Sequence, residues 1–372
     1  MTVDYATDTD EVDDGMKTPT GEPSADGNVQ QTPVSTTAEG GVMAEPVVLE
    51  PESPEDISDN DSALGQDDNA SSTVSMTSSI VAYRIENGRT YHAYKEQIGY
   101  PLPNDAAEQA RLDLQHHLFS LTFDGRLYFS PVDSGRPVRR CLDAGTGTGA
   151  WAVDFADDHP GADVIGIDIS PIQPAFVPPN LSFQVDDLED DWTFSQPFDF
   201  IFSRMMTGAI DDWPRFFRQS LAGLSPGGWL ECHDICLPAR SDDGTLRPDS
   251  ALAQWSDRIF EATSIQGRPC NGARLYRQQM IDAGFVNVRE IRFKWPMNRW
   301  PADPHYKDLG FWTHQNIAGG ISGLSMALFT RVLRWSPQEL EVFLAKVRDD
   351  MKNRTIHAYW TIHVVYGQCP GY

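Results

Sequence analysis

The chain has 372 residues, of which 40% are hydrophobic and 22% charged, and its formal net charge is −25. This length accommodates one large domain or two smaller ones. The acidic balance and the lack of any Lys/Arg cluster argue against nucleic-acid binding, and no apolar run approaches the ~18 residues of a membrane span.

The negative charge is concentrated in the first 80 residues. That segment carries 18 of the 54 acidic residues and a single basic one, Lys17, and it has no Trp or Phe. It cannot bury enough apolar surface to offset the entropy of ordering, so we expect residues 1–80 to form a disordered acidic tail. The tail either solubilises the chain or serves as an interaction arm for a regulatory protein partner.

The N-terminal sequence and the cysteines both bear on the cellular compartment. No basic start precedes an apolar core, so no secretory signal is expected. The five cysteines are odd in number and scattered from Cys141 to Cys369, which does not suit a disulfide framework. We therefore expect an intracellular protein, cytoplasmic in the main hypothesis and nuclear in the alternative.

The composition changes at Val81, where aromatic and basic residues appear. A helix is predicted over residues 105–123, which carry regularly spaced leucines. We expect residues 81–135 to form a helical N-terminal cap on the domain that follows.

Strands and helices then alternate along the chain. Short apolar runs predict five strands, and amphipathic segments between them predict helices over residues 149–158 and 213–224. The strands are expected at residues 138–142, 164–167, 181–185, 198–202 and 229–235. This alternation predicts a parallel sheet with helices on both faces, and residues 136–236 are expected to form its cofactor-binding core.

The last third of the chain has a different pattern. Helices are predicted over residues 251–264, 273–283 and 337–352, and residues 306–332 are amphipathic and contain glycines. Residues 285–294 and 356–366 read as two late strands, which would suit a hairpin at the edge of the sheet. We expect residues 237–372 to supply these strands, the substrate side and a lid.

Three glycines follow the first predicted strand, in the run Asp143-Ala-Gly-Thr-Gly-Thr-Gly149. Glycine permits a tight turn, and the free N–H groups of the following helix favour an anion. The anion is the methionine carboxylate in S-adenosylmethionine (SAM) and the pyrophosphate in a dinucleotide. The turn fits both ligands, and Asp168 after the second strand would bind ribose hydroxyls in either case.

Other features favour SAM over a dinucleotide. Asp143 precedes the first glycine, and the motif lies in mid-chain after a helical segment. The third predicted strand ends at Asp186-Asp187-Leu188, where a carboxylate can accept a hydrogen bond from the adenine amino group. An NAD-dependent oxidoreductase stays as a minor alternative.

From Tyr83 onwards the chain resembles the fungal LaeA-like methyltransferases, a class I SAM-dependent family of secondary-metabolism methyltransferases and regulators. The matching stretches are Glu86-Asn-Gly-Arg-Thr-Tyr-His92, Asp143-Ala-Gly-Thr-Gly-Thr-Gly-Ala-Trp-Ala152, Gly166-Ile-Asp-Ile-Ser-Pro-Ile-Gln-Pro174, Asp187-Leu-Glu189 with Trp192, and Ile356-His-Ala-Tyr359. The resemblance implies an α/β fold with a Rossmann-like class I methyltransferase sheet of five parallel strands and a late edge hairpin.

The resemblance also implies a cofactor site for SAM, whose parts are carried over residue by residue. The methionine end would meet Asp143, Gly145 and Gly147, and the ribose diol would meet Asp168. The adenine would meet Ile169, Asp187 and Leu188, and the sulfonium side would be flanked by Ser203 and Arg204.

Methyl transfer from SAM depends mainly on holding a nucleophile in line with the methyl group, so a general base is needed only for a nucleophile of high pKa. If a base is used, His233 or Asp234 at the end of the fifth strand is the expected residue. No metal is expected, because Cys232 and Cys236 are spaced along a strand and not around an ion.

Two segments are expected to close over the site. Trp312 and His314 would belong to a substrate lid within residues 306–332, with aromatic packing against the sheet as the alternative. Tyr83, Tyr91 and His92 would fold over the cofactor as an N-terminal flap, with plain packing as the alternative.

The sequence thus favours a SAM-dependent methyltransferase acting on a small-molecule acceptor, in particular a secondary metabolite. The alternative is a LaeA-like regulator of secondary metabolism in a nuclear protein complex.

Overall fold

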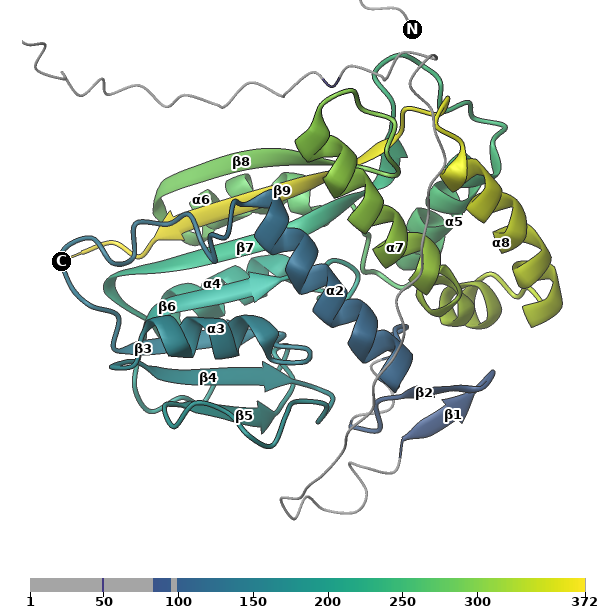
Figure 1. Ribbon diagram of the computed structural model, residues 1–372. Coiled ribbons are helices and arrows are strands. Elements are labelled where there is room, and N and C mark those ends of the chain that lie inside the picture. The colour runs from purple at the N-terminus through teal and green to yellow at the C-terminus, as the bar shows by residue number, and fades with distance from the viewer. Residues whose placement is uncertain (1–48, 50–82, 95–98, 372) are drawn as a thin grey trace, which may run out of the picture. The chain divides into compact units, whose positions relative to one another are not determined.

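The computed structural model describes residue 49, residues 83–94 and residues 99–371 (Figure 1). The predicted acidic tail over residues 1–80 lies outside the described residues, apart from residue 49.

A seven-stranded sheet forms the centre of the fold. Its strands are β3 (Arg140–Ala144), β4 (Asp163–Asp168), β5 (Leu181–Val185), β6 (Phe198–Arg204), β7 (Leu224–Arg240), β8 (Val286–Pro296) and β9 (Tyr359–Gln368). They lie in the order β5-β4-β3-β6-β7-β9-β8. The first five pair in parallel, which confirms the five strands expected from the apolar runs.

The two late strands lie together at one edge of the sheet, as expected. β9 is antiparallel to β8 and also to β7, so it is inserted between them. The connection from β8 to β9 contains the helices α7 (Pro304–Ala327) and α8 (Pro337–Lys352). The pair is therefore a long-range antiparallel ladder and not a tight hairpin.

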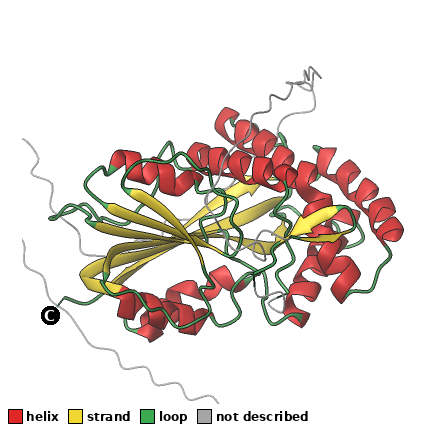
Figure 2. Cartoon of the chain, turned by 90° about the horizontal axis from the view of Figure 1, so that it is seen from below, coloured by secondary structure: helices red, strands yellow, loops and turns green. Residues whose placement is uncertain are grey.

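Helices cover both faces of the sheet (Figure 2). The remaining helices are α2 (Ala106–Thr122), α3 (Ala150–Asp158), α4 (Trp213–Gly223), α5 (Ala251–Ile265) and α6 (Tyr276–Ala283). In Figure 1, α2, α3 and α7 lie in front of the sheet and α4 and α6 behind it. Successive strand residues serve opposite faces, since Cys141 packs in the cluster of α3 and Leu142 in the cluster of α4.

The chain before α2 forms a β-hairpin that the sequence analysis did not anticipate. β1 (Arg84–Glu86) and β2 (Arg89–Tyr91) are joined by Asn87 and Gly88, whose φ angles are +50° and +77°. Asn-Gly is the pair that a two-residue turn with two positive φ angles favours. The expected helical lead-in is present as α2, which Asp105 caps by accepting a hydrogen bond from the Glu108 N–H at 3.1 Å.

Helix α2 packs against α7 around a buried ion pair. Arg111 donates to Glu108 at 2.7 and 3.0 Å and to Asn316 of α7 at 2.8 Å. A Cβ atom at Gly320 of α7 would lie 2.3 Å from the Arg111 side chain, so the missing side chain provides the space for this guanidinium stem. The hydrogen bond from Arg111 to Asn316 fixes α2 against α7, and both helices border the site described below.

Helix α7 covers most of the amphipathic segment predicted over residues 306–332 and continues into a π-helix, Leu328–Val332. None of the described helices is both long enough and apolar enough to cross a membrane.

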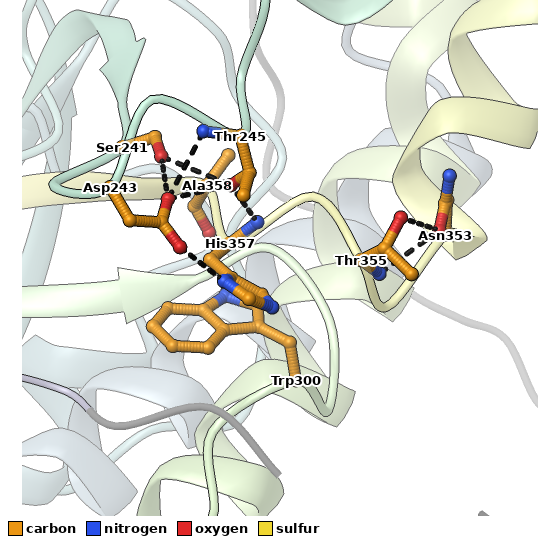
Figure 3. Close-up of polar contacts among 8 residues, drawn as sticks. All are labelled: Ser241, Asp243, Thr245, Trp300, Asn353, Thr355, His357 and Ala358. Carbon is orange, nitrogen blue, oxygen red and sulfur yellow. Dashed lines mark hydrogen bonds and ion pairs between the residues drawn. The ribbon is translucent and has the colours of Figure 1, made fainter. Parts of the chain in front are cut away.

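The Ile356-His-Ala-Tyr359 stretch anchors a distant loop, as Figure 3 shows. Asp243 accepts hydrogen bonds from Ser241 Oγ at 2.6 Å, Thr245 Oγ1 at 2.7 Å and His357 Nδ1 at 2.5 Å. The Thr245 hydroxyl in turn accepts from the His357 backbone N–H at 2.8 Å. These bonds tie the loop after β7 to the start of β9, so this motif has a structural role.

Candidate functional site

The carboxyl ends of β3, β4 and β6 border two adjoining cavities. With the open solvent at their mouths, the first amounts to about 770 Å³ and the second to about 460 Å³. They share Tyr100, Gly145, Asp168 and Met206. Ligands of open α/β sheets bind at this edge, and we call the two together the cofactor groove.

The glycine-rich turn between β3 and α3 forms the floor of the groove. The N–H groups of Gly145 and Thr146 donate to the Ile167 carbonyl at 2.9 and 2.8 Å, which ties the turn to β4. The Gln173 amide donates to the Gly147 carbonyl at 2.7 Å. The Pro-Ile-Gln-Pro stretch therefore braces this turn.

Gly145 is required by both its conformation and its surroundings. Its φ angle is +83°, and a Cβ atom there would lie 2.1 Å from Met206 Sδ. A side chain at position 145 would therefore adopt a strained backbone conformation and force the Met206 side chain to move.

Two aspartates of the groove have pKa values above the usual value for aspartate. Burial raises the pKa of Asp143 to about 6, although its carboxylate accepts a hydrogen bond from Thr146 Oγ1 at 2.6 Å. Burial likewise raises the pKa of Asp168 to about 6. The Asp168 carboxylate accepts from the N–H groups of Gly147 and Ser170, both at 2.9 Å, and it lines both cavities.

Arg204 lies near the Asp143 carboxylate in the groove, and the two charges stabilise one another without forming a direct ion pair. Its Nη2 donates to His116 Nδ1 at 2.8 Å, and its guanidinium lies 4.8 Å from the centre of the Phe119 ring. Burial lowers its pKa to about 10, so it stays charged at neutral pH. No carboxylate of the described residues forms an ion pair with it. Such a cation can hold a ligand carboxylate.

The second cavity contains the residues expected around adenine. Ile169, Asp187 and Leu188 all line it. Asp187 Oδ1 accepts from the Glu189 N–H at 2.9 Å, which fixes the carboxylate at the start of the loop after β5. Ser203, by contrast, is buried in β6 between β3 and β7 and lines neither cavity.

A third cavity adjoins the groove and is mostly apolar; its space, together with the open solvent at its mouth, amounts to about 880 Å³. It shares Tyr100, Leu112, Gln115 and Met205 with the first cavity. Its apolar walls come from β7, α5, α7, the π-helix and β9, and include Ile235, Leu237, Trp255, Ile259, Ile317, Leu324, Leu328 and Trp360. We call it the acceptor cavity.

The structure does not bring His233 to any of these cavities. The side chain is fully buried among Phe119, Phe123 and Phe202, and its Nε2 is hydrogen-bonded to Glu231 Oε1 at 2.6 Å. Burial lowers the pKa of His233. A base must reach its proton donor, and this imidazole has no access to the acceptor cavity.

Asp234 lies behind the cavity wall. Its carboxylate accepts from the Tyr276 hydroxyl at 2.8 Å and from the Thr207 N–H at 3.1 Å, and burial raises its pKa to about 7. Thr207 and Ile235 line the acceptor cavity, whereas Asp234 does not. The hydrogen bonds that the Asp234 carboxylate accepts from the Thr207 and Ile235 N–H groups position these two residues.

The two segments that were expected to close over the site, the lid and the flap, make different contacts. Trp312 packs against His117, with ring centres 4.8 Å apart, and neither Trp312 nor His314 lines the acceptor cavity. The flap hairpin is instead held by Arg331 of the π-helix, which pairs with Glu86 at 2.9 Å and lies 4.5 Å from the centre of the Tyr91 ring.

Tyr100, Gln115 and the Met205-Met206 pair line these cavities and were not anticipated. A usable signal existed for Gln115, because it follows Glu108 and Leu112 at helical spacing on α2.

Comparisons with known proteins agree with this geometry. Residues 114–290 match the family described as methyltransferase domain. Methyltransferase pytC of Aspergillus terreus is 41% identical over 82% of this chain and 93% of its own length. Probable methyltransferase tdiE of Emericella nidulans is 40% identical over 71% of this chain and 82% of its own length.

A third relative carries a different description. Secondary metabolism regulator LAE1 of Cochliobolus heterostrophus is 39% identical over 75% of this chain and 92% of its own length. Together with the glycine-rich turn and the groove, these relationships show that the chain belongs to the LaeA-like family of class I SAM-dependent methyltransferases.

Proposed function

We propose that the protein transfers the methyl group of SAM to a small, largely apolar acceptor of secondary metabolism. The observation that carries this proposal is the apolar acceptor cavity that adjoins the cofactor groove. The relatives described as methyltransferases support methyl transfer, and the relative described as a secondary metabolism regulator supports the assignment to secondary metabolism.

The residues of the groove fit SAM. The Arg204 cation suits the methionine carboxylate, and the buried Asp143 carboxylate suits the adjacent ammonium. Gly145 and Gly147 keep the turn open to the ligand. Asp168, at the junction of the two cavities, would hold the ribose diol.

The adenine would lie in the second cavity, between Ile169 and Leu188, with Asp187 at its amino edge. When bound, SAM supplies a sulfonium-activated methyl group: the bond from the nucleophile to carbon would form as the carbon–sulfur bond breaks, which leaves the neutral thioether sulfur of S-adenosylhomocysteine, and the proton of an O–H nucleophile would pass to water. The chain contributes by binding and orienting the acceptor, which can supply about 7–11 kcal/mol of the barrier reduction. We assign no proton transfer to His233 or Asp234.

We extend the proposal to the domain plan and the compartment. Residues 81–135 would cap the domain, residues 136–236 would hold the cofactor, and residues 237–372 would form the acceptor side. All five cysteines are free thiols, which supports an intracellular, reducing compartment.

A labelling experiment tests the proposed function. The protein is incubated with methyl-tritiated SAM and either the organic-solvent extract or the protein fraction of the organism that carries the gene. We expect label in the organic-soluble fraction. Label that enters only the protein fraction would contradict a small-molecule acceptor.

A regulatory role is the second candidate, favoured by the relative described as a secondary metabolism regulator. The two candidates separate in a deletion strain complemented with a variant that does not bind SAM. Loss of one methylated product alone supports the biosynthetic role, whereas changes across several metabolite families support the regulatory role.

Replacing Gly145 by Ala should lower SAM affinity by about tenfold. The new Cβ atom would clash with Met206 Sδ, and a left-handed Ala costs about 1–2 kcal/mol. Isothermal titration measures the effect. Gly135→Ala is a matched control, because its φ is +100° but its surroundings are open. Adding Met206→Ala to Gly145→Ala should restore part of the affinity, and wild-type affinity in Gly145→Ala would refute the steric argument.

SAM affinity should fall as the pH is lowered through about 6. Burial raises the pKa of both Asp143 and Asp168 to about 6 in the free protein, and binding to an ammonium or a ribose diol favours the charged carboxylates. Protonation therefore competes with binding below that pH, and each group costs roughly tenfold one unit below its pKa. Titrations from pH 8 to 5 measure this dependence. An affinity that is constant or rises on acidification would contradict these roles.

A further inference from the structure

Four residues line both the cofactor groove and the acceptor cavity. They are Tyr100, Leu112, Gln115 and Met205, and we call the place where they meet the shared opening. An acceptor in the apolar cavity would approach a methyl group in the groove at these residues. Leu112 and Met205 are apolar, so the polar groups offered there are the Tyr100 hydroxyl and the Gln115 amide.

The Gln115 side chain has no protein partner for its amide. The residue is only 5% exposed and makes no side-chain hydrogen bond with any part of the chain that the structure describes, yet neither amide atom is among the fully enclosed polar atoms without a partner. The amide is therefore open to the cavities that Gln115 lines, where a ligand can meet its hydrogen-bonding groups.

The helix that carries Gln115 holds the amide in place. One turn before it, Arg111 is bound to Glu108 on the same helix and to Asn316 on α7. At the N-terminus of α2, the Asp105 carboxylate accepts a hydrogen bond from the Arg89 Nη2 at 2.8 Å. A polar group on so constrained a helix can orient a ligand with little loss of entropy.

The charges around the acceptor cavity indicate a neutral ligand. Among the described residues that line it, Arg111 is the one cation, and its three guanidinium nitrogens already serve Glu108 and Asn316. The same described lining contains no Asp or Glu. A carboxylate or an ammonium would enter this apolar space without a counter-charge, which is strongly unfavourable.

We propose that Gln115 binds the hydroxyl group of a neutral, largely apolar acceptor and orients it at the shared opening. A primary amide offers both an acceptor oxygen and donor N–H groups, so it can satisfy both the proton and a lone pair of a hydroxyl. Tyr100 is the other polar residue that lines both spaces. This inference rests on the proposed function and narrows its acceptor to a hydroxyl compound.

Two probe molecules test the inference without knowledge of the natural acceptor. 1-Naphthol and naphthalene share one apolar body and differ by a hydroxyl group. Their dissociation constants are measured by ligand-observed NMR on protein loaded with S-adenosylhomocysteine. The wild-type protein should bind 1-naphthol roughly 5- to 10-fold more tightly than naphthalene, the range of one net hydrogen bond.

The variant Gln115→Met keeps the length of the side chain and removes the amide. It should abolish the preference for 1-naphthol while leaving naphthalene affinity within about twofold. Gln115→Ala should lose the preference as well. It replaces Gln115→Met as the test variant if the Met side chain packs poorly. Gln278→Met on α6 is the matched control, since it makes the same change at an exposed position and should keep the wild-type preference.

Unchanged preference in both Gln115 variants would overturn the inference, as would equal affinity of the wild-type protein for the two probes or no binding of either. Binding of S-adenosylhomocysteine is measured in every sample. Failure of the wild-type protein to bind it would count against the proposed function itself. Intact cofactor binding without a hydroxyl preference would count against the inference alone.

Discussion

Replacing Asp168 by Ala is expected to weaken SAM binding by about 100-fold. The carboxylate lies where the two cavities of the cofactor groove meet, and it would accept hydrogen bonds from both ribose hydroxyls. Hydrogen bonds to a charged group contribute about 1.5–3 kcal/mol each. The substitution also removes the acceptor of the Gly147 and Ser170 N–H groups, which fix the turn.

Isothermal titration with SAM measures the loss. Asp163→Ala is a suitable control, because Asp163 begins the same strand, is exposed and pairs only with Arg140 at the surface. It should keep wild-type affinity. Asp168→Asn retains the shape and one acceptor oxygen, so it should lose less than Asp168→Ala. An Asp168→Ala affinity within threefold of wild type would remove the ribose role.

Replacing Arg111 by Met is expected to lower the free energy of unfolding by about 3–5 kcal/mol. The side chains of Arg111 and Glu108 are only 7% and 3% exposed, so the substitution leaves an uncompensated carboxylate in the interior. It also removes the donor to Asn316, which joins α2 to α7. Urea unfolding followed by circular dichroism measures the change.

A second Arg–Glu pair of the same spacing shows what burial contributes. Arg258 and Glu261 of α5 are 50% and 45% exposed, so Arg258→Met should cost less than about 1 kcal/mol. The double variant Glu108→Met/Arg111→Met should recover most of the loss, because no buried charge is left. Equal costs for Arg111→Met and Arg258→Met would contradict the account of this pair.

The strands and the groove were predictable because their signals are local. Each parallel strand is an apolar run, and the ligand-side residues lie where a strand ends, as Asp168 does at the last position of β4. The glycine-rich turn also reveals itself by its spacing. The β1–β2 hairpin had an equally local signal in Asn87-Gly88, which the sequence analysis did not use.

The placement of His233 and Asp234 depends on a strand end that the sequence does not reveal. The fifth strand was expected to stop at residue 235, which would put both side chains at the ligand edge. β7 continues to Arg240 because β9 pairs with it beyond that point, so His233 and Asp234 lie opposite Val364 and His363 in mid-strand. This pairing joins segments some 130 residues apart.

The shared opening could not be read from sequence for a similar reason. Gln115 is polar on a predominantly packed helix, and its role depends on which residues of α7 and the loop after β6 meet α2. Tyr100 belongs to no helix or strand, and its place at the junction of all three cavities is a property of the folded chain.

The central claim is that the groove at the ends of β3, β4 and β6 holds SAM, and calorimetric titration with SAM and NAD in parallel tests it most directly. We expect one SAM per chain with a dissociation constant in the range of about 1 μM to 1 mM that is usual for enzyme ligands, and no heat from NAD. Binding of NAD, or no binding of SAM at millimolar concentration, would contradict the account.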